Sequence, residues 1–193
     1  MSPGTVSLGT VSSGTGPPHL DRAANVFGAL ALIVTDQATD AVAAAAGRSD
    51  TAAAALSALL HFLDRPSIDR LRQVLGLTSS GTVRLVDRLA ESGYVRRDPG
   101  ADRRSTAIVL TEQGRRAAGQ VSAARAEVLE RSLAVLSPDE RATFERLTGK
   151  VLVGMMRGPG ATRWMCRLCD IGTCRGAEGL CPVGNAAIER YGR

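Results

Sequence analysis

The sequence predicts a mainly α fold with a small β wing, in which a winged helix-turn-helix is joined to a helical dimerisation region. Two observations predict this fold class. Between residues 67 and 111, two short amphipathic helical patterns are separated by a glycine and followed by an arginine-rich hairpin. On either side lie longer helical patterns with apolar stripes, and a chain of 193 residues has too little surface of its own to bury them.

The first twenty residues are a low-complexity stretch of Gly, Ser, Thr and Pro in which GTVS occurs twice. This composition has no helical period and cannot bury a core, so we expect a disordered tail. The stretch has neither a basic n-region nor an apolar h-region, which argues against a signal peptide.

Residues 21–46 predict a long helix that Gly47 ends, and a second helix follows from Thr51 to Leu63. The apolar stripe of the long helix consists of Val26, Leu30, Ile33, Val34, Ala38 and Ala41.

The helix-turn-helix begins at Ser67, an N-cap candidate that follows Pro66. Its first helix extends to Leu75, and Gly76 breaks it with the tight turn that this motif needs. The second helix runs from Thr78 to Ser92, with Gly93 as a C-cap candidate. Its apolar stripe is expected to pack on the first helix and consists of Val83, Val86, Leu89 and Ala90. The polar face then points outward to contact bases and grooves, through Ser79, Ser80, Thr82, Arg84 and Arg88.

The wing is predicted from a change of period after Gly93. A short strand containing Arg96 and Arg97 leads into the turn at residues 98–102, and residues 105–110 form the returning strand. In a winged helix the second helix enters a major groove, and the hairpin reaches the neighbouring minor groove or backbone. We therefore expect a phosphate contact from Arg97. The wing-tip contacts are expected from Arg103 and Arg104, with Asp102 orienting them.

Two further helices are expected after the wing, from Thr111 to about Leu136 and from Pro138 to about Arg157. The run SPDE at residues 137–140 combines an N-cap Ser, a Pro at the first helical position and a Glu as capping-box partner.

The run VRLVDRLAESGYVRRDPGADRRSTAIVLTEQG, residues 83–114, resembles the MarR family of bacterial transcription regulators. The resemblance rests on VDRL followed by SGYVRR, on the wing-tip DRR and on LTEQG. It extends, as an arrangement of helices, over about residues 24–157. It implies a homodimer in which the first and the last two helices of the fold intertwine between subunits. Many relatives bind aromatic acids between the winged and helical parts, which leaves a small-molecule effector open as a partner.

The charge distribution agrees with a double-stranded DNA partner. Residues 70–104 contain eight arginines and four acidic residues, and the whole chain carries a net charge of +5 with a pI near 9.6. Phosphate contacts from such a patch give salt-dependent affinity. A twofold dimer would present two recognition helices to a pseudo-palindromic operator.

The C-terminal stretch from Trp164 to Pro182 holds all four cysteines of the chain, in the spacing C-x2-C-x4-C-x6-C. Four thiolates bind either an iron–sulfur cluster or zinc: Cys-Pro ends many cluster motifs, and C-x2-C is the usual zinc half-site. Two further interpretations of the cysteine stretch stay open: a metal-free thiol/disulfide switch, or no function at all. The candidate ligands are Cys166, Cys169, Cys174 and Cys181.

These patterns divide the chain into four expected parts. They are a disordered tail (1–20), a helical dimerisation region (21–47 and 111–157), a winged helix-turn-helix DNA-binding domain (48–110) and a cysteine-rich metal- or cluster-binding tail (158–193).

The expected function is that of a sequence-specific DNA-binding transcription regulator, a repressor that acts as a homodimer. A metal or iron–sulfur site in its C-terminal tail is expected to switch its activity. The alternative is a metal- or cluster-carrying redox or interaction protein whose winged helix makes protein contacts. No nucleophile elbow, phosphate loop, HExxH motif or His–Cys pair is present, so no enzyme is expected. No run approaches about 18 uncharged apolar residues with long side chains, so we expect no membrane partner and a cytoplasmic protein.

Overall fold

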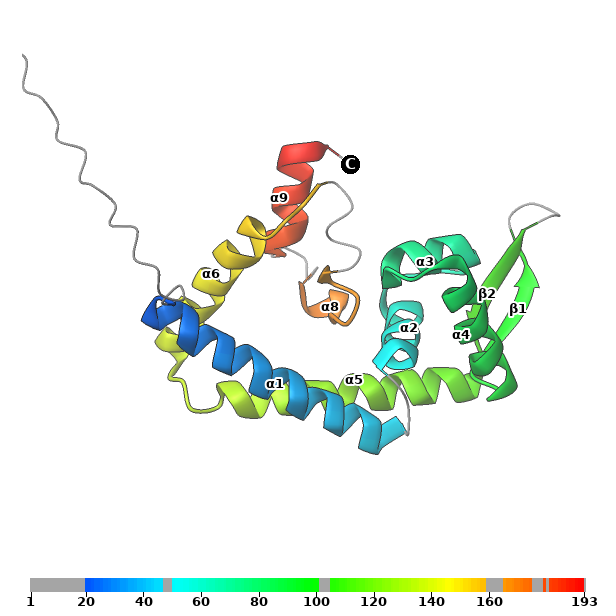
Figure 1. Ribbon diagram of the computed structural model, residues 1–193, viewed down its shortest axis with the longest axis horizontal. Coiled ribbons are helices and arrows are strands. Elements are labelled where there is room, and N and C mark those ends of the chain that lie inside the picture. Colours follow the sequence, from blue (N-terminus) through cyan, green and yellow to red (C-terminus); the bar gives the residue numbers. More distant parts are fainter. Residues whose placement is uncertain are drawn as a thin grey trace, which may run out of the picture. The chain divides into compact units, whose positions relative to one another are not determined.

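The computed structural model describes residues 20–46, 50–100, 105–158, 165–174, 179 and 181–192. The expected N-terminal tail lies almost wholly outside these residues. Figure 1 shows the helices and strands. In chain order they are α1 (Arg22–Ala46), α2 (Asp50–His61), α3 (Ile68–Leu75), α4 (Ser79–Glu91), β1 (Val95–Pro99), β2 (Thr106–Leu110), α5 (Glu112–Leu133), α6 (Pro138–Gly154), α8 (Ile171–Cys174) and α9 (Pro182–Tyr191).

This mainly helical fold with one two-stranded antiparallel sheet confirms the predicted fold class. In the sheet Val95 lies opposite Leu110, and Pro99 lies opposite Thr106. A backbone hydrogen bond of 2.9 Å from Ile108 N–H to Pro66 O joins β2 to the residue before the α3 cap. The wing is therefore attached to the helix-turn-helix by backbone bonds as well as by packing.

The predicted capping signals of α3 and α6 are confirmed. The Ser67 side chain accepts a hydrogen bond from the Arg70 backbone N–H at 3.1 Å, and Gly76 ends α3 in the left-handed conformation with φ 65°. The Ser137 side chain and Glu140 form the reciprocal capping box that begins α6.

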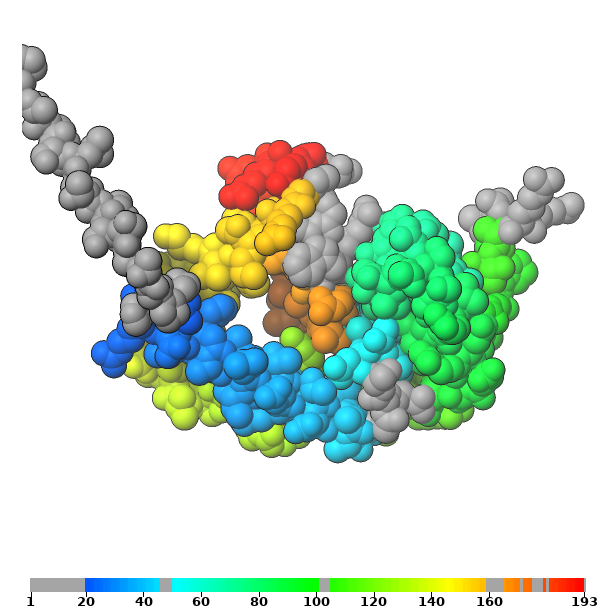
Figure 2. All heavy atoms as spheres, viewed as in Figure 1, coloured from blue at the N-terminus to red at the C-terminus, as the bar shows by residue number. Residues whose placement is uncertain are grey.

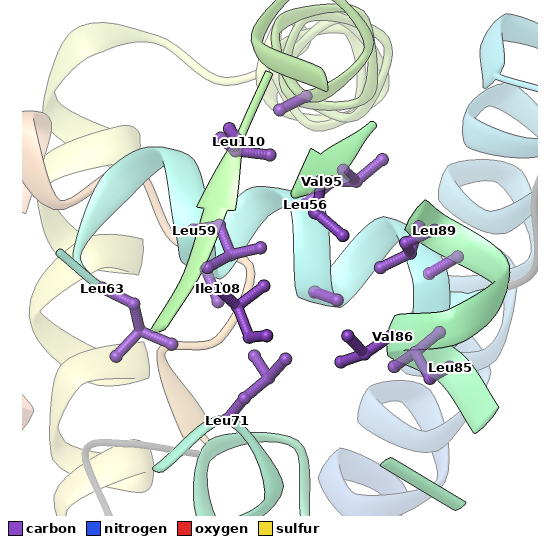
Figure 3. Packing of buried hydrophobic residues seen from close by; sticks show 14 of the residues in the cluster. Leu56, Leu59, Leu63, Leu71, Leu85, Val86, Leu89, Val95, Ile108 and Leu110 are labelled. Atoms are coloured by element: carbon purple, nitrogen blue, oxygen red, sulfur yellow. The ribbon is translucent and has the colours of Figure 1, made fainter. Parts of the chain in front are cut away.

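One core unites the winged part of the chain. Figure 3 shows side chains from α2, α3, α4 and both strands converging on one another. Ala117 and Ala118 add the N-terminal half of α5 to this core. Burial of so many apolar groups fixes α4 and the wing relative to α2 and α5. The residues labelled in the figure are Leu56, Leu59, Leu63, Leu71, Leu85, Val86, Leu89, Val95, Ile108 and Leu110.

The chain divides into two units, residues up to Ile33 and residues from Val34 onward. The first unit includes the beginning of α1, which is the blue segment in Figure 2. The large apolar side chains of this part of the helix are exposed. Its exposed large apolar residues are Val26, Phe27, Leu30, Leu32 and Ile33.

By length and composition α1 is apolar enough to cross a membrane, since residues 22–45 have a mean hydropathy of 1.3. The sequence expectation concerned an uncharged run of long apolar side chains, and this alanine-rich helix does not contradict it. The helix also contains Asp36 and Asp40, and a helix that packs on another subunit passes the same criterion.

Candidate nucleic-acid interface and cysteine site

Helix α4 is held by a cap at its first turn and by a fully packed inner face. The Thr78 side chain accepts a hydrogen bond from the Gly81 backbone N–H at 3.2 Å, so the helix begins at a fixed residue. Leu85, Val86 and Leu89 are buried in the core. The opposite face is exposed and polar, and four of the predicted DNA-contact residues lie on it: Ser79, Ser80, Arg84 and Arg88.

The predicted outward orientation of Thr82 is wrong, because its side chain is 0% exposed. Thr82, Leu85, Val86 and Leu89 follow the i, i+3, i+4, i+7 spacing of one helix face. The Thr82 hydroxyl donates to the Thr78 carbonyl oxygen at 2.9 Å, so it is buried without losing a hydrogen bond. Val83, which was expected in the core, is 40% exposed and joins the outer face instead.

The arginines of this outer face remain available to an anionic partner. The Arg84 Nε–H donates to the Ser80 carbonyl oxygen at 3.3 Å, which directs the side chain along the helix. Among the described residues, neither Arg84 nor Arg88 has an acidic partner within salt-bridge distance. The exposed face of α4 therefore combines positive charge with short hydroxyl side chains.

Strand β1 is fixed by ion pairs that the sequence did not indicate. The Arg97 guanidinium pairs with Asp87 of α4, and Arg96 pairs with Asp98. Arg65, which has φ 44°, donates from Nη1 to Asp98 Oδ2 and from Nη2 to the Pro99 carbonyl oxygen, both at 3.0 Å. Arg65 was missed because no local motif marks a residue whose partners lie 33 positions away. These bonds orient the wing relative to α4, and the phosphate contact of Arg97 stays a prediction.

The predicted wing-tip residues Asp102, Arg103 and Arg104 lie outside the described residues. The base of the hairpin is described: the Gly100 backbone N–H donates to the Ser105 carbonyl oxygen at 2.9 Å.

The four cysteines are free thiols that are each half-buried. The side chains of Cys166 and Cys169 are hydrogen bonded to each other, as are those of Cys174 and Cys181. Cys166 interacts electrostatically with each of the other three cysteines. The structure thus brings the predicted ligands together as two adjacent pairs. Within the described residues no group of three or more His, Cys, Asp or Glu side chains stands at metal-binding geometry.

The surroundings of the thiols shift their pKa values in different directions. The hydrogen bond from Cys166 lowers the pKa of Cys169 to about 6, assisted by the positive charges of Arg125 and Arg167. The same hydrogen bond, together with burial, raises the pKa of Cys166. Burial also raises the pKa of Cys174. Cys169 is therefore the thiol most readily present as a thiolate.

The cysteine segment is attached to the helical body at several points. Arg125 of α5 donates from Nη1 to the Leu168 carbonyl oxygen at 3.2 Å. Asp170 Oδ1 lies 4.0 Å from Nδ1 of His61, whose Nε2 is 2.9 Å from Ser122 Oγ of α5. Cys181 packs against a small apolar cluster whose buried members are Met156, Val183 and Ala186.

A cavity of about 400 Å³ lies beside this segment, within the unit that starts at Val34. Residues of α1 and α2 form one side of it, and Arg125, Leu129, Arg167 and Leu168 contribute the other. The lining is mixed: it includes the guanidinium groups of Arg125 and Arg167 and the carboxylate of Asp50 beside apolar side chains.

Comparisons with known proteins agree with this geometry. Residues 46–105 match the family model of the MarR family. An uncharacterized HTH-type transcriptional regulator of Bacillus subtilis (strain 168), YfiV, is 35% identical over 83 residues, 42% of this chain. The chain spans about half, 52%, of the length of that relative.

Two solved structures extend the likeness beyond the winged part. A MarR family protein from Bacillus stearothermophilus is 25% identical with a TM-score of 0.62, and the match covers 70% of this chain and 94% of that one. Sco3205 from Streptomyces coelicolor, a MarR family transcriptional regulator in complex with DNA, is 18% identical with a TM-score of 0.58, over 79% of this chain and 99% of that one. The fold of this chain is therefore the winged-helix fold of the MarR-family regulators.

Proposed function

We propose that this chain is a MarR-family, sequence-specific DNA-binding transcription regulator that acts as a homodimer in the cytoplasm. The observation that carries the proposal is the outer face of α4, where Arg84 and Arg88 stand without acidic partners among the described residues on a capped, core-packed helix. Such a face can read base edges in a major groove while the wing contacts the flanking backbone. The DNA complex of Sco3205 supports it, since that regulator has the same fold.

The dimer is proposed from apolar surface that the described chain leaves exposed. Leu147 and Val151 of α6 and its C-cap residue Met155 are exposed and follow one another at four-residue spacing, so they lie on one face. The beginning of α1 carries a second exposed apolar set. Apolar surface on this scale is typical of an interface, and a second copy of the chain is the occupant that gives two α4 helices for a pseudo-palindromic operator. A dimer bound there would act as a repressor by covering the site.

Replacing Leu147 and Val151 together by Asp is expected to convert the dimer to a monomer, because each buried carboxylate would lack a partner. Light scattering at a fixed protein concentration measures the mass. Val135→Asp is the matched control, since Val135 is 85% exposed and lies outside the α6 stripe. A double variant that keeps the dimer mass would contradict the assignment of α6 to the interface.

The direct test of DNA binding uses a random-sequence duplex, because non-specific affinity needs no knowledge of the operator. Fluorescence anisotropy should show binding at low salt that weakens by ~1,000-fold between about 50 and about 200 mM salt, as counterion release requires. No binding at low salt would refute the proposal.

A second candidate function has its own observation. The thiol pairs and the low pKa of Cys169 suit a metal- or cluster-carrying redox or interaction protein whose winged part makes protein contacts. Such a protein has no need to bind DNA, so the same anisotropy titration separates the two functions.

We propose further that the cysteine segment switches operator affinity. The segment contacts α5 through Arg125, and α5 shares the core of the winged part. Titrating the operator before and after exposure of the protein to a zinc and iron chelator tests this. Equal affinities in both states would leave the segment without a regulatory role.

A further inference from the structure

Turns of the backbone lie at or beside the four cysteines. The Cys169 backbone N–H donates to the Cys166 carbonyl oxygen at 2.9 Å, which closes a turn between the two cysteines. Gly179, with φ 61°, precedes Cys181 by two residues and permits a second turn there. Cys166 and Cys169 therefore lie at the two ends of one turn, and Cys181 follows a second.

The backbone also offers hydrogen bonds to sulfur. Cys181 is the N-cap of α9, and its Sγ accepts a hydrogen bond from the Gly184 backbone N–H at 3.2 Å. The N-terminus of a helix stabilises a negatively charged sulfur, and hydrogen bonds of this kind orient the thiolate ligands of metal centres.

Two positive charges, Arg125 and Arg167, and one negative charge, Asp170, lie near the cysteines. Arg125 and Arg167 both interact electrostatically with Cys169, and Arg125 is half-buried. Four thiolates around one divalent ion leave a net charge of about −2. The two guanidinium groups would offset that charge.

From the chemistry of this donor set we propose a single four-thiolate metal centre, bound by Cys166, Cys169, Cys174 and Cys181, with Arg125 as a positioning residue that supplies countercharge. The two pairs must close on one another to bind it, because they do not already stand at coordination geometry. A zinc ion and an iron–sulfur cluster share this ligand chemistry. The centre rests on the proposed switch by the cysteine segment. Its absence would remove that switch but leave DNA binding by α4 untouched, so the two failures are distinguishable.

The first experiment measures metal, sulfide and the visible spectrum of the full chain purified without oxygen. One colourless zinc per chain, or a brown protein with iron and acid-labile sulfide, is the expected result, and the two outcomes distinguish the ions. Protein without metal that takes up neither zinc nor, with sulfide, iron would overturn the proposal. Formation of two disulfides in place of metal uptake would overturn it too.

Serine variants then locate the ligands. Cys169→Ser and Cys174→Ser are each expected to lose the metal, while far-ultraviolet circular dichroism retains the helix content of the remaining chain. Thr173→Ala is the matched control, because its hydroxyl donates to Asp170 and to no cysteine, at 3.0 Å. Wild-type metal content in both serine variants would place the metal elsewhere and overturn the assignment.

The countercharge is tested by zinc affinity in competition with a chelator. Arg125→Met is expected to weaken zinc binding by about tenfold, and Arg125→Lys to restore most of it, because charge and not shape is the cause. Arg131→Met, on the same helix but paired with Glu127, should bind zinc as the wild type does. Equal loss in the Met and Lys variants would show that Arg125 acts only by packing.

Discussion

Replacing Arg84 and Arg88 by Ala is expected to lower operator affinity by about a hundredfold or more, with each single substitution giving about tenfold or more. Both side chains extend from the exposed face of α4, and a dimer places each of them on the DNA twice. A bidentate contact from arginine to a base contributes about 1–3 kcal/mol of discrimination. The substitutions should reduce the preference for the operator over random DNA as well as the affinity.

Anisotropy titrations with operator and random duplexes measure both quantities. Two controls bracket the result: Arg131→Ala removes a charge from α5, and Thr82→Val removes a hydroxyl that the structure buries. Both should keep operator affinity within about twofold, although Thr82→Val loses one hydrogen bond worth about 1 kcal/mol of stability. If the double variant bound as tightly as these controls, α4 would not be the recognition helix.

Replacing Gly114 by Ala is expected to lower the free energy of unfolding by about 3 kcal/mol or more. A Cβ atom at Gly114 would lie 1.9 Å from the Tyr94 carbonyl oxygen and 2.8 Å from the Tyr94 carbonyl carbon. Neither atom can move freely, because the Thr111 backbone N–H donates to that same oxygen at 3.0 Å. Relief of the overlap would therefore separate α5 from the residue that leads into β1.

Gly119→Ala provides the matched control on the same helix. No atom lies within 4 Å of a Cβ built at Gly119, so the substitution should stabilise α5 by about 0.5–1 kcal/mol through helix propensity alone. Urea unfolding of the two variants and the wild type gives the comparison. Equal stability of the two variants would show that α5 does not approach Tyr94 as closely as described.

The parts of the fold that local chemistry determines were predictable from the sequence. The Ser67 cap, the Gly76 turn and the Ser137–Glu140 capping box each depend on residues within a few positions of one another. The inner face of α4 was placed incorrectly because Thr82 was assumed to be polar and outward. A threonine can bury its hydroxyl against the carbonyl one turn earlier, and the helical spacing of Leu85, Val86 and Leu89 was the better guide.

The remaining features depend on contacts between distant residues. Arg65 reaches Asp98, and Arg125 reaches Leu168, with no sequence pattern that pairs them. The cysteine spacing indicated a ligand set but gave no sign that α5 would supply its positive neighbour. The exposed apolar face of α6 is a different case, because its burial depends on a second chain.

Selection of bound duplexes from a random-sequence pool by the wild-type protein tests the central claim most directly. We predict enrichment of an inverted repeat whose half-site centres lie about one helical turn of DNA apart, as two symmetry-related α4 helices require. The variant lacking Arg84 and Arg88 should lose that enrichment. A bound pool with the same base composition and order as the input would contradict the assignment of this chain as a sequence-specific DNA-binding dimer.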